Sequence, residues 1–314
     1  MIPKIQHAGS LRERIASAYQ QACEVELDAL KPGNVHRYAN GHAMTAEDFL
    51  TSARVSAGPL TEPGLGLGER IYRSVAATRE AVGCNTNLGI LLLCAPLVQT
   101  LLDERPATAL LRERLYHVLR QAGVEDTRWL FHAIALAAPG GLGQSDKHDV
   151  SGPPTAGLRE VMAHAAGRDR IAFQYTTGYA DLFGFALPRL RFFEERWHSR
   201  KWAAAGLFLS LLASFPDTHI QRKYGRSKAV EISRRAAALS QGLLHADQPE
   251  TYHQHLLQAD TEFKREGINP GTTADLTVAS LFLLVLQRTC PSLVRNAGFS
   301  RNCESLPAEG WVHL

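Results

Sequence analysis

The sequence contains few cysteines, and they are not arranged in close pairs. Its 314 residues include five, at positions 23, 84, 94, 290 and 303, which is an odd number with wide spacing. A zinc ribbon needs closely spaced cysteine pairs, so this class of metal site is excluded. We interpret the five side chains as reduced thiols and expect a cytoplasmic protein.

We expect neither a secretory signal nor a membrane span in this sequence. Residues 1–7 are followed by charged residues, with no apolar stretch before a small-residue cleavage site. The longest apolar run, residues 88–102, contains Pro96 and Gln99. It is shorter than the ~20 residues that a membrane span needs. We therefore expect a buried core helix there, and another at residues 276–286.

No block of like charge stands out. The formal net charge is +3, and the chain is 45% hydrophobic and 21% charged. These fractions are typical of a globular protein and exclude wholesale disorder. Without a lysine- and arginine-rich stripe or tail, nucleic acid is not an expected partner.

Strand-like alternation of apolar and polar residues is scarce, whereas helical spacing is common. Leu11, Ile15, Ala18, Ala22 and Val25 recur at intervals of three and four residues, which predicts one buried face of a helix over residues 11–30. Similar patterns predict further helices at residues 46–55, 68–82, 88–102, 108–122, 127–138, 157–167, 171–185, 189–197, 202–215, 227–244, 250–265 and 274–289.

No linker or shift in composition divides the chain. We therefore expect a single all-α domain over residues 1–314, with buried apolar helices at its centre. Residues 291–314 are expected to form an irregular tail.

Acidic and histidine side chains gather where the predicted helices stop. Glu26 precedes a Lys-Pro-Gly-Asn turn, Asp149 follows a glycine-rich segment, and Asp217 follows the apolar run 202–215. A carboxylate at a helix C-terminus is unfavourable by roughly 0.3 to 1 kcal/mol, and a bound cation would reverse that sign. We therefore predict that these helix ends converge on one metal-assisted, phosphate-handling site.

Two segments have an ordinary structural explanation beside the functional one. Glu26 and Lys31-Pro32-Gly33-Asn34 could supply a metal ligand, a triphosphate contact and a turn carrying Asn34, or they could be a surface acid and a routine helix stop. Asn85-Thr86-Asn87 could cap the helix from residue 88, and the same helix N-terminus could bind an anion.

The segment from Pro139 to Asp149 combines glycines with charge. Gly140 and Gly141 allow a close backbone approach, and their N–H groups could cradle a phosphate. Asp146, Lys147, His148 and Asp149 are costly to hold together unless a ligand or metal balances them. His148-Asp149 is similar to the doublet of HD-class metal phosphohydrolases, but that doublet sits inside a helix and this one precedes loop-forming residues.

Residues 217–225 couple Asp217 and His219 to Arg222 and Lys223. A site for a nucleoside triphosphate needs carboxylates to bind Mg²⁺ and basic side chains to bind the phosphate oxygens. A solvated turn is the alternative. Asp275, just inside the last long helix, is stabilised there by the helix dipole without a ligand. We interpret the histidines on helical segments as ordinary core or surface residues.

Five motifs, taken in order, resemble the triphosphoribosyl-dephospho-CoA synthase family. They are residues 26–35, 83–87, 139–143, 217–219 and 269–276. The resemblance implies an all-helical enzyme of cofactor biosynthesis, which transfers the triphosphoribosyl unit of ATP to the 2′-hydroxyl of 3′-dephospho-CoA and releases adenine. It implies that ATP and the acceptor are the partners and that Mg²⁺ or another divalent cation assists. A homo-oligomer is possible.

The resemblance also implies roles for residues. Displacement of adenine passes through an oxocarbenium-like state, which one carboxylate stabilises while another takes the acceptor proton. We assign catalysis to Asp149, Asp217, His148 and His219. Metal binding is assigned to Glu26, Asp149, Asp217 and Asp275. Substrate binding is assigned to Lys31, Asn34, Asn85, Thr86, Gly140, Gly141, Arg222, Lys223 and Thr272.

One motif departs from the family pattern. Where the family commonly has Asn-Thr-His-Lys-Gly, this chain has Asn85-Thr86-Asn87-Leu88-Gly89. The missing imidazole and ammonium leave other acceptors open, including a hydroxyl in tetrahydromethanopterin-type cofactor biosynthesis, where similar divergent members occur. A metal-dependent phosphohydrolase and a non-enzymatic nucleotide-binding regulator are the further alternatives.

Overall fold

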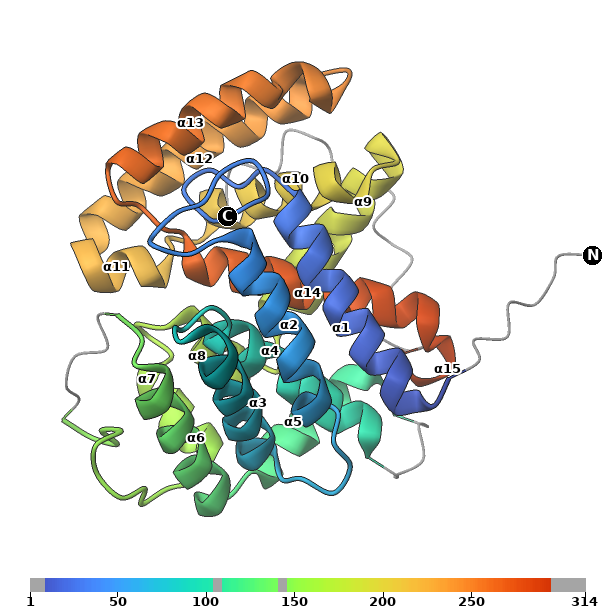
Figure 1. Cartoon of the computed structure of the whole chain (residues 1–314), viewed down its shortest axis with the longest axis vertical. Helices are drawn as coiled ribbons and strands as arrows, with labels where there is room; N and C mark the ends of the chain where they lie inside the picture. Colours follow the sequence, from blue (N-terminus) through green and yellow to red (C-terminus); the bar gives the residue numbers. More distant parts are fainter. Residues whose placement is uncertain (1–8, 104–108, 141–145, 295–314) are drawn as a thin grey trace, which may run out of the picture.

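The structure, a computed structural model, describes residues 9–103, 109–140 and 146–294, which are mainly helical (Figure 1). Apart from isolated bridges at His36–Ala39 and Gly41–Met44, these residues contain no strand pairing. The predicted all-α fold is thus confirmed. The helices are α1 (Leu11–Asp28), α2 (Ala46–Leu60), α3 (Leu67–Val82), α4 (Leu88–Leu102), α5 (Leu111–Gln121), α6 (Val124–Ala137), α7 (Leu158–Ala165), α8 (Arg170–Thr177), α9 (Leu187–Trp197), α10 (Arg200–Ser214), α11 (Thr218–Tyr224), α12 (Arg226–His245), α13 (His253–Arg265), α14 (Gly271–Thr289) and α15 (Pro291–Val294).

Three nearly all-apolar helices form the centre of the domain. α14 packs against α1, α4 and α10, and most side chains of α4, α10 and α14 are buried. In Figure 1, α12 and α13 lie beside each other at one end, and α6 and α7 lie at the other. No helix of the described segments has both the length and the apolarity that a bilayer span requires.

Pro96 lies inside α4 without ending it. Proline has no N–H, so the carbonyl of Leu92, four residues earlier, loses its usual helical donor. Tyr175 donates a hydrogen bond to this carbonyl at 2.6 Å, and Tyr179 donates one to Leu93 O at 2.9 Å. Both tyrosines are fully buried. The proline is therefore accommodated by packing from a segment far away in the sequence.

The structure corrects some predicted boundaries. The helix predicted at 171–185 ends at Thr177, because Gly178 and Tyr179 both adopt left-handed backbone conformations. A π-helical turn, Leu182–Ala186, then leads directly into α9. α11 was not predicted as a helix. The tail expected at 291–314 begins with the short helix α15, and its residues 295–314 lie outside the described part of the chain.

Candidate active site

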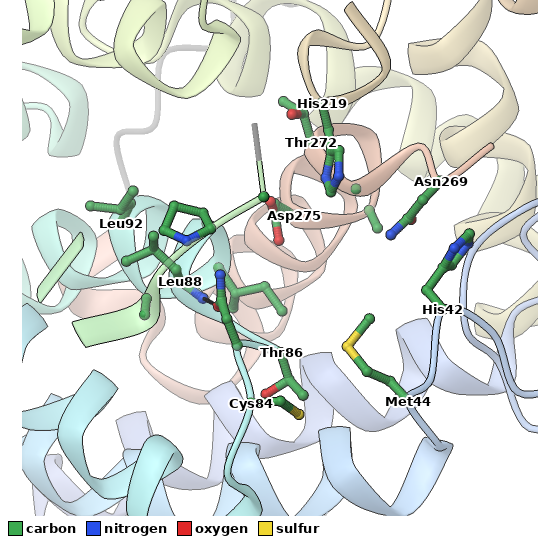
Figure 2. A pocket seen from close by; sticks show the side chains of 18 of the residues that line it. His42, Met44, Cys84, Thr86, Leu88, Leu92, His219, Asn269, Thr272 and Asp275 are labelled. Carbon is green, nitrogen blue, oxygen red and sulfur yellow. Dashed lines mark hydrogen bonds between the residues drawn. The ribbon is translucent and has the colours of Figure 1, made fainter. Parts of the chain in front are cut away.

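The ends of several helices surround a cavity of about 660 Å³ (Figure 2). α1 ends beside it, α4 and α14 begin there, and residues of α11 line one side. The site residues assigned from the sequence that line this cavity are Glu26, Asn34, Asn85, Thr86, Gly140, His219, Arg222, Lys223, Thr272 and Asp275. The structure therefore brings residues from five separate segments around one space.

The other assigned residues lie elsewhere. Lys31, His148, Asp149 and Asp217 are not among the cavity walls. Gly141 falls outside the described residues.

The cavity has a polar side and an apolar side. In Figure 2, His42, Asn269 and His219 lie on one side, Leu88 and Leu92 lie on the other, and Asp275 stands between them. Further apolar residues of the lining are Ile134 of α6, Ile171 of α8 and Ala274 of α14. The polar side continues into Arg222 and Lys223 of α11. Such a division suits a ligand with one anionic end and one flat or apolar end.

Asp275 lies one turn into α14, with its carboxylate facing the cavity. Within the described part of the chain nothing hydrogen-bonds this carboxylate. Burial, together with the charges of Asp217 and Glu26, raises the pKa of Asp275 well above its usual value. Gly89 makes room for it, since a Cβ at this position would lie 2.0 Å from Asp275 Oδ2. Asp275 is therefore a free carboxyl group in the middle of the cavity.

Glu26 and Lys31 form a buried pair below the cavity. Glu26 Oε1 lies 2.6 Å from Lys31 Nζ, and the side chain of Lys31 is 0% exposed. Lys31 also donates to Val35 O at 2.7 Å and to Asn34 Oδ1 at 3.3 Å. Burial raises the pKa of Glu26 and lowers that of Lys31, and each partner's charge opposes the other's shift. The ammonium thus fixes the wall from beneath and does not face the cavity.

Asn34 joins two of the motifs that were noted in the sequence. Its Nδ2 donates to Asn269 Oδ1 at 2.8 Å, so the Lys-Pro-Gly-Asn turn after α1 meets the Asn-Pro-Gly turn before α14. Gly33 is required at this contact: its φ is +85°, and a Cβ there would lie 2.8 Å from Ile268 O. Two of the five motifs noted in the sequence therefore meet in one physical contact.

Asp217 is occupied by structural hydrogen bonds. Its Oδ1 accepts from the N–H groups of His219 and Ile220 at 2.9 and 3.0 Å and so caps α11. Its Oδ2 accepts from the N–H and the hydroxyl of Thr273 at 2.8 and 2.7 Å. The residue is 2% exposed. Asp217 therefore ties the start of α11 to the start of α14.

His148 and Asp149 lie in a turn away from the cavity walls. Asp149 Oδ1 accepts from the N–H and the hydroxyl of Ser151, at 2.9 and 2.6 Å. His148 has a φ of +54°, and its ring packs edge-on against His164 with 5.8 Å between centroids.

Sequence reasoning missed Asp169, which lines the cavity. Its Oδ1 accepts from the N–H groups of Ile171 and Ala172, which caps α8, while its Oδ2 accepts from Arg222 Nη1 at 2.7 Å. An aspartate just before a predicted helix was the available signal. The carboxylate holds the Arg222 guanidinium at the polar side of the cavity.

His42 and Met44, also missed, come from the loop between α1 and α2. Their sequence context carried no signal. His219 lies near His42 on the polar side, and burial lowers the pKa of His219, with Arg222 and His42 adding to the shift and Asp217 opposing it.

The divergent turn before α4 places its two unusual residues differently. Leu88 lines the cavity, whereas Asn87 is not on its walls and donates to Ser56 Oγ at 3.3 Å. Asn85 Oδ1 accepts from Leu88 N at 3.1 Å, which satisfies one of the free N–H groups at the helix start. Of these two residues, only Leu88 therefore faces the cavity.

Carboxylates suited to a divalent cation are present, but they are dispersed. The described residues include no cluster of three or more histidine, cysteine or acidic side chains that could hold a metal ion by themselves. Mg²⁺ is usually held by one or two carboxylates together with substrate phosphates. The carboxylates of the cavity lining that could share a cation with such phosphates are Glu26, Asp169 and Asp275.

Comparison with known proteins shows which family the chain resembles. A protein from Archaeoglobus fulgidus, whose crystal structure is described as that of a candidate triphosphoribosyl-dephospho-CoA synthase, matches 80% of this chain over its full length, with 24% identity and a TM-score of 0.58. Among curated proteins, none matches. The model of the ATP:dephospho-CoA triphosphoribosyl transferase family matches residues 12–292. The chain therefore belongs to this family and is a pentosyltransferase.

Proposed function

We propose that the protein transfers the triphosphoribosyl unit of ATP to the hydroxyl of an alcohol and releases adenine. The observation that carries this proposal is the position of Asp275, a free carboxyl group that stands between His42, Asn269 and His219 on one side and Leu88 and Leu92 on the other (Figure 2). The cations Arg222 and Lys223 line the same cavity. Membership of the transferase family supports the same chemistry.

The geometry suggests how ATP would lie. Arg222 and Lys223 can hold the triphosphate by charge-assisted hydrogen bonds. The ribose would then reach Asp275, whose carboxylate form stabilises positive charge developing at C1′ as adenine leaves. His219, which also lines the cavity, is available to take the proton of the incoming hydroxyl. Direct displacement by this hydroxyl inverts C1′ and needs no covalent sugar–enzyme intermediate.

A divalent cation fits this arrangement as part of the ATP complex. Asp275 and Glu26 would hold it together with phosphate oxygens. The cation would neutralise phosphate charge.

The acceptor is the less constrained substrate. The family acts on dephospho-CoA, but here Leu88 lies on an apolar wall with Leu92 and Ile134. A lysine at position 88 would add a phosphate contact worth roughly 1.5 to 3 kcal/mol. We therefore infer that the acceptor carries little charge near this wall, which favours a different alcohol over dephospho-CoA. Leu88→Lys, alone or with Asn87→His, should improve the use of dephospho-CoA, while efficient transfer by the wild type would oppose the inference.

Incubation with ATP, Mg²⁺ and 3′-dephospho-CoA, followed by mass spectrometry, tests the proposal. Transfer is expected to release one adenine for each ribosylated acceptor. A phosphohydrolase would release phosphate and leave the N-glycosidic bond intact, and a nucleotide-binding regulator would bind ATP without turnover. Slow transfer to dephospho-CoA should be followed by a panel of uncharged alcohols. Phosphate release without adenine would refute the proposed reaction.

A further inference from the structure

The loop between α1 and α2, residues 32–45, forms one wall of the cavity. Its Asn34, His42 and Met44 side chains line the space (Figure 2). The loop is neither helix nor strand, and its strand-like pairing is limited to two isolated bridges, His36–Ala39 and Gly41–Met44. Without a regular hydrogen-bond ladder, the directions of its side chains depend on individual contacts, of which the hydrogen bond from Lys31 Nζ to Val35 O is one.

Part of this loop is strained. His42 and Ala43 have φ values of +56° and +60°, in the left-handed region that residues with a Cβ rarely adopt. Such conformations cost free energy and persist only where surrounding contacts impose them. His42 also lies with its Nε2 2.8 Å from Gly33 O, so its ring direction depends on the first turn of the loop. Something outside the loop must therefore hold it.

Asp260 of α13 provides the first of these contacts. Its side chain is only 3% exposed. Oδ1 accepts from Gly33 N at 2.9 Å, while Oδ2 lies 2.9 Å from Lys264 Nζ and 3.2 Å from His36 Nε2. A buried carboxylate with three polar neighbours is costly to disturb.

Lys264, one turn further along α13, provides the second. Its Nζ donates to Ala39 O at 3.1 Å as well as to Asp260. Its stem lies close to Gly41, where a Cβ would be 3.1 Å from Lys264 Cε. Asp260 and Lys264 thus contact the loop at successive points along its length, although neither side chain lines the cavity.

We propose that Asp260 and Lys264 are positioning residues, which clamp the 32–45 loop in the conformation that places Asn34 and His42 on the cavity wall. They act through the loop and do not touch the ligand. The effect expected on enzyme kinetics rests on the proposed function. The effect expected on amide hydrogen exchange of the loop does not.

The charge state of Asp260 agrees with a tight clamp. Burial alone would raise the pKa of this carboxyl group. The hydrogen bonds from Lys264 and Gly33, together with the nearby ring of His36, outweigh burial and hold the pKa below its usual value.

Amide hydrogen exchange of the full chain tests the clamp directly. Asp260→Ala should speed exchange in peptides covering 33–44 by at least about tenfold, because the N–H groups of His36, Ala39 and Met44 lose the fixed loop that protects them. Peptides from α4 and α14 should exchange as in the wild type. Asp260→Asn, which keeps an acceptor for Gly33 N–H, should give a smaller increase.

Lys264→Met provides a second variant in case Asp260→Ala does not fold, since it keeps the stem and removes only the ammonium. It should affect peptides around Ala39 most. The matched controls are Glu262→Gln and Arg265→Met on the same helix, neither of which contacts the loop. Unchanged loop exchange in the folded Asp260 and Lys264 variants would overturn the proposal.

Kinetics distinguish positioning from simple structural support. Weakening the clamp should raise KM for MgATP by about tenfold with a smaller change in kcat, because the loop contributes to the polar side of the cavity. Asn34→Ala and His42→Ala, which remove groups of the cavity wall itself, should reproduce this KM effect. A fall in kcat alone in the Asp260 variants would contradict the positioning role. If the wild type releases no adenine, the proposed function fails while hydrogen exchange still decides the clamp.

Discussion

At the scale of single residues, the charged groups of the site divide into those that face the cavity and those that support it from behind. Asp275 and His219 face it, whereas Lys31 and Asp217 are buried behind the wall. A buried group with every polar atom paired is expected to contribute to stability, and a cavity-facing group without a partner is expected to contribute to binding or catalysis. The two classes can be separated by mutation.

Lys31→Met should destabilise the protein strongly. It leaves Glu26 buried without its counter-charge, a change that typically costs about 3–5 kcal/mol of unfolding free energy. Adding Glu26→Gln should recover a large part of the loss, because no uncompensated charge then remains. Urea denaturation of the two single variants and the double variant measures this. A loss below about 1 kcal/mol for Lys31→Met would show that the pair is not coupled as its 2.6 Å distance indicates.

Asp275→Asn should lower adenine release by at least about 100-fold while the protein remains folded, as expected when a catalytic carboxylate or metal ligand is removed. Asp149→Asn and Asp217→Asn are the variants for comparison, because the sequence analysis assigned both aspartates to catalysis. Asp217→Asn should mainly lower stability, because one amide group cannot accept all the hydrogen bonds that the carboxylate accepts. If Asp149→Asn lowers adenine release as much as Asp275→Asn does, the catalytic role assigned to Asp149 from the sequence would be supported.

At the scale of helices, two helices can pack closely where one of them has a glycine at the contact. A Cβ at Gly68 of α3 would lie 2.1 Å from the backbone oxygen of Asp126 in α6. A backbone atom cannot move aside as the end of a flexible side chain can, so the two helices would have to separate. The contact between α3 and α6 therefore requires glycine at this position.

Gly68→Ala should accordingly lower the free energy of unfolding by about 1–3 kcal/mol, the usual cost of overpacking. Gly58→Ala in α2 is the matched control, since its Cβ would meet nothing within 4 Å. This substitution should stabilise the protein by roughly 0.4–1 kcal/mol by restricting the unfolded chain. Equal effects of the two substitutions in thermal unfolding would contradict the crossing argument.

The helices themselves were largely predictable from apolar periodicity, but their interruptions were not. The break at Gly178 and Tyr179 accompanies hydrogen bonds from Tyr175 and Tyr179 to α4, a partner far away in the sequence. α11 was missed because it is short and polar, and its cap, Asp217, is fixed by Thr273 of α14.

Contacts with residues far away in the sequence also limit how much of the site can be predicted. Local context identified Glu26 and Asp275 as acids near helix ends, and both line the cavity. It could not distinguish them from Asp217, one of whose carboxylate oxygens is satisfied by Thr273, 56 positions away. It also could not identify His42, because the loop that carries this residue is positioned by Asp260 of α13.

At the scale of the whole molecule, the cavity joins segments that are distant along the chain. Glu26, Gly89, Gly140, Arg222 and Asp275 all contribute to its walls. A ligand that contacts several of these segments binds the folded state and has no equivalent site in the unfolded chain. It should therefore raise the stability of the entire domain by mass action.

MgATP should accordingly raise the melting temperature in a concentration-dependent manner. The gain is about 2.7 kcal/mol at a ligand concentration 100 times Kd, which corresponds to several degrees for a chain of this length. Arg222→Ala with Lys223→Ala should reduce the shift substantially, because phosphate contacts are made in the ground state. Lys201→Ala with Arg234→Ala removes the same charge from exposed positions outside the cavity lining and should leave the shift unchanged. Adenosine, which lacks phosphates, should give a much smaller shift. If both double variants respond to MgATP as the wild type does, the triphosphate does not bind at α11, and the orientation proposed for ATP is wrong.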